Sequence, residues 1–266
     1  MVEVGGEWPS KISGYKLEYV IGQGSFGIVW AAQVREGPYK GSKIAIKILD
    51  LTQHEDDTIS ELRKEISIMS QSMHKNLVTE FTSFIDETYL WLVMSLIDAG
   101  SCIDIVKATH PNGIKDESVI ASIIKETLDG LIYFHDNNKV HRDIKGGNIL
   151  MDMAGHVFLC DFGVSASVKK GEKRGTLCGS PCWMAPEIMN GSGHDYKADI
   201  WSTGITAIEL AMGDAPYSDM PPVKVVVEIL NSSPPSLPAD APFSRLFRNF
   251  VAACLIKEPR QRPSAK

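Results

Sequence analysis

The stretch IGQGSFGIVW, residues Ile21 to Trp30, has glycines in the pattern G-x-G-x-x-G and decides between two nucleotide-binding folds. In a dinucleotide-binding fold the third glycine opens a helix, and an acidic residue follows about 20 positions later. Here IVWAAQV follows the third glycine and predicts a strand, while the position about twenty residues on is Lys47, in the strand-like run IAIKIL. The glycines are therefore predicted to lie in a β-hairpin: Gly22, Gly24 and Gly27.

The size and composition fit a soluble globular protein. The chain has 266 residues, 44% hydrophobic and 23% charged, which suits one two-lobed domain or two small ones. A net charge of −6 argues against a general nucleic-acid or anionic-membrane surface, and the five cysteines suit a reducing compartment. No apolar run approaches the ~18 residues of a membrane span, and MVEVGGEWPS lacks the basic start and apolar core expected of a signal peptide. We therefore expect a cytoplasmic protein with no nucleic-acid partner and no membrane insertion.

Hydrophobic patterning divides the chain near residues 98–101. Residues 15–98 alternate as strands do, apart from an amphipathic helix expected near residues 57–72. Farther on, helical periods dominate, as in ESVIASIIKETLDGLIYFHD and KADIWSTGITAIELAMG. The expected fold class is α+β: an N-terminal extension (1–14), a small antiparallel-sheet lobe with one helix (15–98) and a larger, mainly helical lobe (99–266). A cleft between two unlike lobes is a natural ligand site.

The motif HRDIKGGNIL follows a predicted helix and precedes a predicted strand. Phosphoryl transfer needs a carboxylate to orient the attacking hydroxyl and charges to hold the phosphates. Asp143 fits the first role, and Lys145 could neutralise the migrating phosphoryl group. Asn148 offers an amide oxygen of the kind that Mg²⁺ shares with phosphates. The spacing therefore predicts a catalytic loop for phosphoryl transfer.

The motif DFG follows the strand-like HVFLC. Asp161, at a strand end, would hold the metal that bridges nucleotide phosphates, with Phe162 packed beneath it. Each acidic residue alone is as easily a solvated loop carboxylate. In order with HRDIKGGN and APE (Ala185 to Glu187), however, the motif predicts a metal site followed by an activation segment.

Lys47 needs a carboxylate partner to fix it against the α and β phosphates. Glu65 on the expected helix is favoured, because KEISIM aligns best with the pattern, and Glu61 one turn earlier competes with it. A surface i,i+4 pair is the alternative interpretation of Glu65.

With these motifs in this order, the chain from Tyr15 onward resembles the eukaryotic protein kinases, which are bilobal and use ATP and Mg²⁺. HRDIKGGN, GSPCWMAPE and KADIWSTGITAIELA resemble the sterile-twenty, germinal-centre kinase group. Within it, YLWLVMSLIDAGS and APYSDMPPVKV resemble the oxidative-stress-responsive and proline/alanine-rich kinases. The resemblance implies a serine/threonine protein kinase that transfers the ATP γ-phosphate to protein Ser and Thr hydroxyls, in stress or ion-homeostasis signalling.

The resemblance also implies roles for residues outside the motifs. Met94 matches the gatekeeper, and Ser95 to Ile97 match the hinge whose backbone bonds adenine. The apolar clamp around adenine is matched by three residues: Ile21, Val29 and Ala45. Asp199 matches the aspartate that anchors the catalytic loop, and Glu187 with Arg262 matches a buried ion pair. Plain core packing is the alternative for the apolar residues.

Regulation is implied in the same way. Lys145 and Ser180 match serine/threonine rather than tyrosine kinases, and Thr176 matches the activating phosphosite of the subgroup. We expect Arg142 to be buried beside the catalytic aspartate, where it calls for an anion that a phosphothreonine supplies. An unmodified flexible loop is the alternative.

Partners are also implied by the resemblance alone. Subgroup relatives carry a C-terminal domain that docks on arginine-phenylalanine motifs. The resemblance thus implies an upstream activating kinase of the with-no-lysine type and cation-chloride cotransporters among the protein substrates. The chain stops at RPSAK, where a kinase domain usually continues into another short helix, so we expect a truncated final helix.

Three other functions compete with a protein kinase as interpretations of these motifs. A pseudokinase would lack part of the machinery, but Lys47, Asp143, Asn148 and Asp161 are all present. A small-molecule phosphotransferase shares the metal-site motifs but has no need of a peptide-docking segment such as GSPCWMAPE. Dinucleotide binding fails on the strand that follows the glycines.

Overall fold

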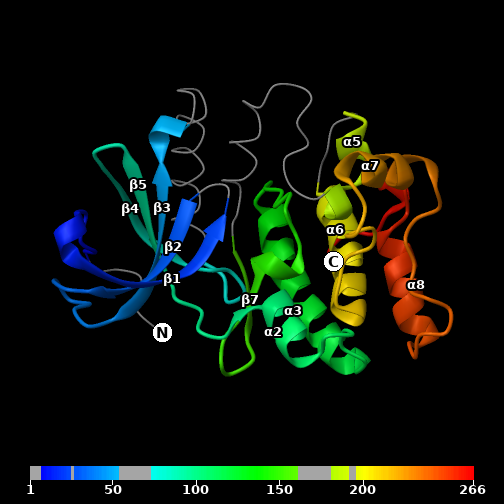
Figure 1. Ribbon diagram of the computed structural model, residues 1–266, viewed down its shortest axis with the longest axis horizontal. Helices are drawn as coiled ribbons and strands as arrows, with labels where there is room; N and C mark the ends of the chain where they lie inside the picture. The colour runs from blue at the N-terminus through cyan, green and yellow to red at the C-terminus, as the bar shows by residue number, and fades with distance from the viewer. Residues whose placement is uncertain (1–6, 25–26, 54–72, 161–180, 192–195) are drawn as a thin grey trace. The chain divides into compact units, whose positions relative to one another are not determined.

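The computed structural model describes residues 7–24, 27–53, 73–160, 181–191 and 196–266 (Figure 1). The described residues form two compact units. Unit 1 runs up to Ile97, and unit 2 begins at Asp98.

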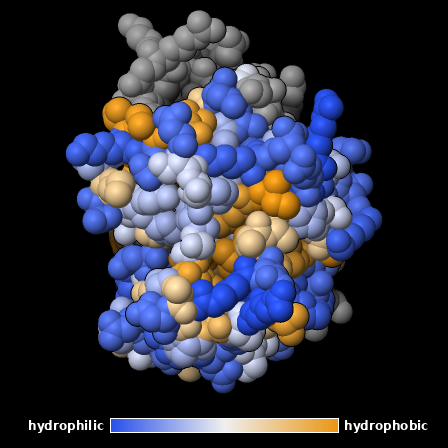
Figure 2. All heavy atoms as spheres, turned by 90° about the vertical axis from the view of Figure 1, so that its right-hand side faces the viewer, coloured by the Kyte–Doolittle hydropathy of each residue, from blue (hydrophilic) through white to orange (hydrophobic). Residues whose placement is uncertain are grey.

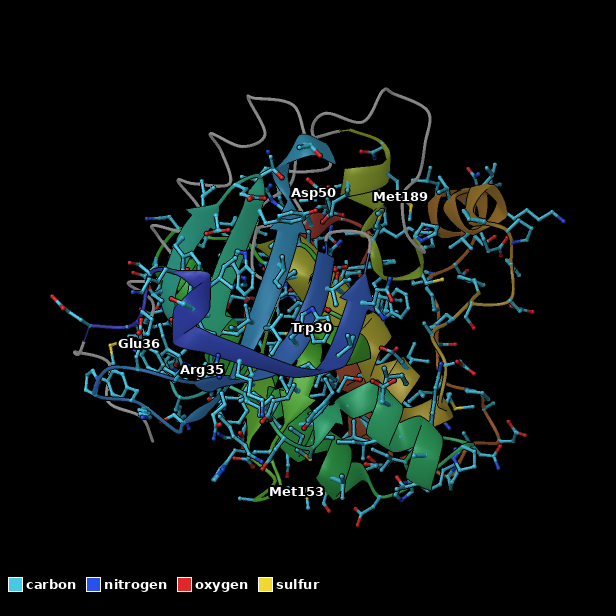
Figure 3. All side chains as sticks on the ribbon, turned by 60° about the vertical axis from the view of Figure 1, so that its left-hand side comes forward. Trp30, Arg35, Glu36, Asp50, Met153 and Met189 are labelled. Atoms are coloured by element: carbon cyan, nitrogen blue, oxygen red, sulfur yellow. The ribbon has the colours of Figure 1, made fainter. Side chains whose placement is uncertain are left out.

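Unit 1 is built on one antiparallel sheet with the strand order β1-β2-β3-β5-β4. Two short 3-10 turns, η1 and η2, flank the first and third strands. Figure 3 marks the sheet by Trp30 on β2 and by Asp50 at the end of β3. The elements are η1 (Ile12–Gly14), β1 (Tyr15–Gly24), β2 (Gly27–Val34), β3 (Lys43–Asp50), η2 (Leu51–Gln53), β4 (Glu80–Asp86) and β5 (Tyr89–Met94).

The two faces of this sheet carry different side chains. One face holds an aromatic core, in which Trp8 stacks between Tyr39 and Phe81 at centroid distances of 4.3 Å each. The opposite face holds a smaller apolar cluster of Leu49, Leu90 and Leu92, with Leu51 and Met94 packed against it. Because Cα partners of antiparallel strands point to the same face, Lys47 shares this second face with its partner Leu92. We call it the Lys47 face.

Unit 2 combines helices with a three-stranded sheet of order β6-β7-β8. Its first elements are β6 (Gly100–Ser101), α2 (Cys102–Thr109), α3 (Glu117–Asp136), η3 (Gly146–Asn148), β7 (Ile149–Met151) and β8 (Val157–Leu159). The later elements are η4 (Pro181–Trp183), α5 (Pro186–Met189), α6 (Lys197–Met212), α7 (Pro222–Asn231), α8 (Arg245–Cys254) and η5 (Pro259–Gln261).

Helix α6 forms the centre of unit 2. All of its residues from Ala198 to Ala211 are buried, so it lies inside the unit rather than on its surface. The helix ends where Gly213 adopts a left-handed conformation with φ 92°, the usual helix terminator. The neighbouring α3 is preceded by Asp116, whose side chain accepts a hydrogen bond from the Ser118 backbone N–H as an N-cap.

These elements confirm the α+β fold class, with an antiparallel sheet in unit 1 and a mainly helical unit 2. The two helices expected from periodicity are present as α3 and α6. The helix expected near residues 57–72 lies outside the described residues. Of the helices that the structure describes, none is both long and apolar enough to cross a bilayer.

Candidate catalytic and nucleotide-binding residues

The sheet of unit 1 brings several predicted nucleotide-binding residues onto the Lys47 face. The register places Gly22 beside Val29, Val29 beside Lys47, and Lys47 beside Leu92, which makes one row across four strands. The next row pairs Ala45 with Met94. Residues far apart in sequence thus become neighbours through strand pairing.

The Lys47 face is apolar around the lysine. Ala45 is 4% exposed and Lys47 is 6% exposed. A buried ammonium on an apolar surface needs a negative partner, because desolvating a charge is costly. Ile21 differs from the rest of the predicted adenine clamp, since it lies at a register shift between Val20 and Gly22 and is 44% exposed.

The glycine stretch forms the predicted hairpin. Gly24 pairs with Gly27, which opens strand β2 and not a helix, so the dinucleotide-fold alternative is excluded. Gly27 has φ 135°, and a Cβ added there would lie 2.2 Å from the carbonyl oxygen of Ile48. Glycine is therefore required at this position by the β2–β3 contact.

The predicted hinge at Ser95 is tied to a residue that the sequence did not indicate. The Ser95 N–H donates to the Thr79 carbonyl at 2.9 Å, and the Thr79 N–H donates to Ser95 Oγ at 3.1 Å. Since the Ser95 N–H is engaged within unit 1, this residue can offer a ligand its carbonyl oxygen rather than its N–H.

In unit 2 the three predicted catalytic-loop residues lie together. Lys145 Nζ donates to Asp143 Oδ2 at 2.8 Å. Asn148 Nδ2 donates to the same Oδ2 at 2.8 Å and to the Asp143 carbonyl at 2.7 Å. The Asp143 carboxylate is thus held by an ammonium and an amide, while it stays 21% exposed.

The backbone of this loop is anchored by Asp199, as the resemblance implied. Its fully buried carboxylate accepts the His141 N–H at 2.9 Å and the Arg142 N–H at 2.8 Å. His135 Nε2 lies 2.8 Å from Asp199 Oδ2 and forms a third contact, which the sequence analysis missed. Arg142 has φ 70°, a strained value for a non-glycine residue that this anchor maintains.

A second buried carboxylate, Glu209, was also missed by the sequence analysis. Its Oε2 accepts the Gly146 N–H at 2.8 Å and the Trp183 Nε1–H at 3.1 Å. Burial raises the pKa of Glu209, and the two donated hydrogen bonds oppose that shift. Glu209 therefore links the catalytic loop to the PCW turn of GSPCWMAPE.

The ion pair between Glu187 and Arg262 is confirmed. Arg262 Nη1 and Nη2 donate to the two Glu187 carboxylate oxygens at 2.8 and 3.1 Å. Both side chains are buried, and the guanidinium lies 5.3 Å from the centroid of the Trp201 ring. The pair joins the APE sequence to the end of the described chain.

Burial of Arg142 was predicted wrongly. Arg142 is exposed, because Asp199 binds its backbone N–H and leaves the side chain outside. Burial therefore gives no reason to expect an anion beside Arg142. Other predicted residues lie outside the described residues: Glu61, Glu65, Asp161, Phe162, Thr176 and Ser180. Within the described ranges, no three His, Cys, Asp or Glu side chains gather as a metal site would require.

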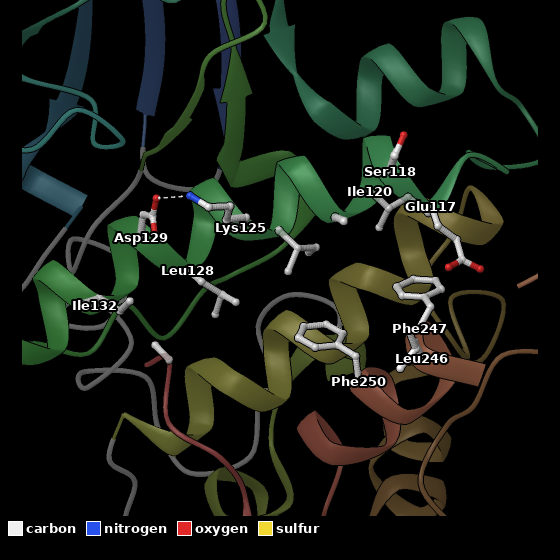
Figure 4. A pocket seen from close by; sticks show the side chains of 13 residues that line it. Glu117, Ser118, Ile120, Lys125, Leu128, Asp129, Ile132, Leu246, Phe247 and Phe250 are labelled. Atoms are coloured by element: carbon white, nitrogen blue, oxygen red, sulfur yellow. Dashed lines mark hydrogen bonds and ion pairs between the residues drawn. The ribbon is translucent and has the colours of Figure 1, made fainter. Parts of the chain in front are cut away.

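A cavity of about 580 Å³ in unit 2 lies apart from the catalytic loop (Figure 4). It is formed by α3 and α8, with apolar side chains such as Leu128 and Phe250. The Lys125–Asp129 ion pair lies at its edge. Figure 2 shows apolar atoms gathered in a hollow on the face that carries α8. Neither Asp143 nor Lys145 lines this cavity, so it is not the candidate catalytic site.

Comparison with known proteins agrees with this geometry. Residues 15–266 match the protein kinase domain family. The chain is 45% identical over 260 residues to "Serine/threonine-protein kinase fray2" of Dictyostelium discoideum, covering 96% of this chain and 25% of the relative. It is 42% identical over 281 residues to "Germinal center kinase 3" of Caenorhabditis elegans, covering 97% of this chain and 46% of the relative. It is 43% identical over 254 residues to "Serine/threonine-protein kinase ppk11" of Schizosaccharomyces pombe, covering 95% of this chain and 78% of the relative.

The loop anchored by Asp199 and the antiparallel sheet with its buried lysine are the features expected of a protein kinase domain. The chain belongs to the protein kinase domain family, and its relatives are serine/threonine kinases of the sterile-twenty, germinal-centre type. It spans between a quarter and a half of the length of the first relatives that it matches.

Proposed function

We propose that this domain transfers the γ-phosphate of Mg-ATP to serine and threonine hydroxyls of protein substrates. The observation that carries the proposal is the arrangement around Asp143, whose Oδ2 accepts from both Lys145 and Asn148 at 2.8 Å. A carboxylate fixed in this way can orient a substrate hydroxyl and accept its proton. The partial exposure of Asp143 leaves room for that hydroxyl.

Lys145 has a second role in this proposal. Its ammonium already lies at the Asp143 carboxylate, so it can follow the negative charge of the phosphoryl group as the group approaches the hydroxyl. Asp199 and Glu209 contribute by holding the loop backbone at Arg142 and Gly146. They are positioning residues, because their contacts are to backbone and to neighbouring side chains.

The Lys47 face supplies the nucleotide-binding residues. Lys47 would bind the α and β phosphates, with Glu65 as its proposed partner, and Gly22, Gly24 and Gly27 would let the hairpin backbone approach the phosphates. The adenine would lie against apolar side chains, with its polar edge at the hinge. The residues proposed for this adenine site are Ile21, Val29, Ala45, Met94, Ser95 and Ile97.

Mg²⁺ would be held by Asn148 and Asp161, with phosphate oxygens completing its coordination. The amide of Asn148 fits such an ion. Both hydrogen bonds that Asn148 donates to Asp143 come from its Nδ2, which leaves the Oδ1 oxygen of the amide for a cation. When bound, the ion neutralises phosphate charge.

Regulation and partners form the finer part of the proposal. Thr176 is the proposed activating phosphosite, and phosphorylation by a with-no-lysine type kinase would place the domain in stress or ion-homeostasis signalling. Cation-chloride cotransporters are proposed among the substrates. Support for these points comes from the resemblance of GSPCWMAPE and APYSDMPPVKV to the oxidative-stress-responsive subgroup.

The test is phosphate transfer from Mg-ATP to a serine/threonine peptide library, with wild-type protein and Asp143→Asn compared. Asp129→Asn is a matched control, because Asp129 also pairs with a lysine, at 3.1 Å, on the exposed surface of α3. We expect transfer to disappear in Asp143→Asn and to persist in Asp129→Asn. Equal transfer by wild type and Asp143→Asn would refute the assignment of Asp143. Nucleotide binding by all three proteins without any transfer would indicate a pseudokinase.

A further inference from the structure

A β-bulge in β4 places an acidic residue on the Lys47 face. Thr82 pairs with Val93 and Ser83 with Leu92, but the register then shifts so that Glu80 pairs with Met94. Leu92 and Met94 point to the same face, so Ser83 and Glu80 share that face although they are three residues apart. Without the bulge, Glu80 would lie on the aromatic face of the sheet. Re-aiming a side chain is a known effect of bulges.

The Glu80 carboxylate is buried in an apolar setting. Glu80 is 7% exposed, and neither of its carboxylate oxygens has a hydrogen-bond partner among the described residues. Burial raises the pKa of Glu80 to about 7, and the Ser83 side chain on the same face offsets part of that rise. A buried carboxyl without partners is costly, so its presence on this face needs an explanation.

Glu80 lies one row from Lys47 on the same face. Row one joins Lys47, Leu92 and Ser83, and row two joins Ala45, Met94 and Glu80. With strands about 4.8 Å apart and about 3.4 Å between residues along a strand, the two Cα atoms are separated by about 12 Å. At that separation two charges interact by roughly 1 kcal/mol at the effective dielectric constant of a protein interior, about 20.

The charges that face Glu80 from the described strands are few. Strand β5 contributes only apolar side chains to this face, and β4 contributes the neutral Ser83. Strand β3 contributes Lys47 and, at its exposed start, Lys43. On these described strands, negative phosphates held at Lys47 would be repelled by an ionised Glu80 on the same face.

We propose that Glu80 tunes the affinity of the Lys47 face for phosphates: its ionised carboxylate disfavours phosphates bound at Lys47, and its protonated form permits them. The inference rests on the proposed role of Lys47 in phosphate binding. Ionisation of Glu80 also offers Lys47 a competing anion, and both effects act in the same direction. Mg-ATP binding should therefore weaken as the pH rises through neutrality.

The experiment measures the dissociation constant of Mg-ATP by isothermal titration calorimetry at pH 6 and pH 8. Wild type is compared with Glu80→Gln, which keeps the shape of the side chain without its charge. Adenosine is the control ligand, because it fills the adenine site and carries no phosphate. For wild type we expect Mg-ATP binding to be about three- to tenfold weaker at pH 8 than at pH 6, relative to the same ratio in Glu80→Gln. Adenosine binding should change equally in both proteins.

Two outcomes would overturn the inference. One is the same pH dependence of Mg-ATP binding in wild type and Glu80→Gln. The other is a change in adenosine binding as large as that of Mg-ATP, which would show that Glu80 acts on the fold of the site rather than on phosphate charge. Lys47→Met separates this result from the proposed function: if that variant binds Mg-ATP like wild type, the phosphate role of Lys47 itself is wrong.

Discussion

Breaking the ion pair between Glu187 and Arg262 should strongly destabilise unit 2. Arg262 is 1% exposed and Glu187 is 5% exposed, so neither charge can turn to solvent. The guanidinium has five N–H donors. In addition to the two bonds to Glu187, Nη1 donates to the Lys197 carbonyl at 2.6 Å, Nε to Ile256 at 2.9 Å and Nη2 to Lys257 at 3.3 Å. All five donors are therefore satisfied in one place.

The expected magnitude follows from this burial. Glu187→Ala leaves a buried guanidinium without its counter-charge, and breaking a buried pair in this way costs about 3–5 kcal/mol. A protein of this size loses about 2–4 °C in Tm for each kcal/mol, so Tm should fall by about 6–20 °C. Arg262→Met should cost a similar amount, because it strands the Glu187 carboxylate. The double variant Glu187→Ala with Arg262→Met should be less destabilised than the sum of the two, since it leaves neither charge unpaired.

The assay is thermal and denaturant unfolding of the two single variants and the double variant, read as a double-mutant cycle. The Asp136–Lys266 pair is the matched control: its length of 2.7 Å is similar, but its side chains are 52% and 64% exposed. Substitutions in an exposed pair should change stability by less than about 1 kcal/mol. If each change at Glu187 and Arg262 also costs less than about 1 kcal/mol and the two effects add, the pair does not stabilise the fold.

Three further predictions concern single residues. Asp199→Asn replaces a carboxylate that accepts several hydrogen bonds with an amide that offers only one oxygen. We therefore expect kcat to fall about 100-fold while the KM for ATP stays within a factor of about three. An unchanged kcat would contradict the anchoring role. Gly27→Ala should lower Tm, because the added Cβ would lie 2.2 Å from the Ile48 carbonyl oxygen. Gly22→Ala should leave Tm unchanged, because the Cβ added there would lie 3.7 Å from its nearest neighbour. Equal Tm values for the two variants would contradict the contact at Gly27. The folded-state pKa of Glu80, about 7, lies above the usual 4.5, so stability should fall as the pH rises through that window. Unfolding should show Glu80→Gln to be more stable than wild type by about 3 kcal/mol at pH 8 and by less than about 1 kcal/mol at pH 5, and an equal difference at both pH values would refute the shift.

The parts of the molecule that could be predicted are those set by local pattern. Helix α3 covers the residues that the helical period indicated, because its start and its apolar stripe are both encoded within the segment itself. The cluster of Asp143, Lys145 and Asn148 was also predictable, since three residues within one short loop meet through local geometry. Proximity in sequence made proximity in space a safe inference.

Contacts between distant residues were less predictable. Nothing in the sequence joins Gly146 to Glu209, and the contact exists because α6 is buried beside the loop. The face that Glu80 occupies depends on the register shift in β4, which local sequence does not specify. The predicted burial of the Arg142 side chain was wrong for a related reason. A backbone hydrogen bond to Asp199 fixes the residue and leaves its side chain exposed. The resemblance to the kinase family implied the roles of Asp199 and Arg262, but it implied no role for Glu80.

The two buried carboxylates of α6 explain how a loop can hold a strained conformation. Asp199 and Glu209 each lose hydration in the interior, a cost that is offset only when donors meet them. The donors that do so are the backbone N–H groups of His141, Arg142 and Gly146, on either side of Asp143. Moving the loop would therefore take hydrogen-bond donors from two buried carboxylates at once, and this cost opposes relaxation of the left-handed Arg142, whose strain is ~1–3 kcal/mol. The position of the Asp143 carboxylate is thus determined by a buried helix rather than by the flexibility of its own loop.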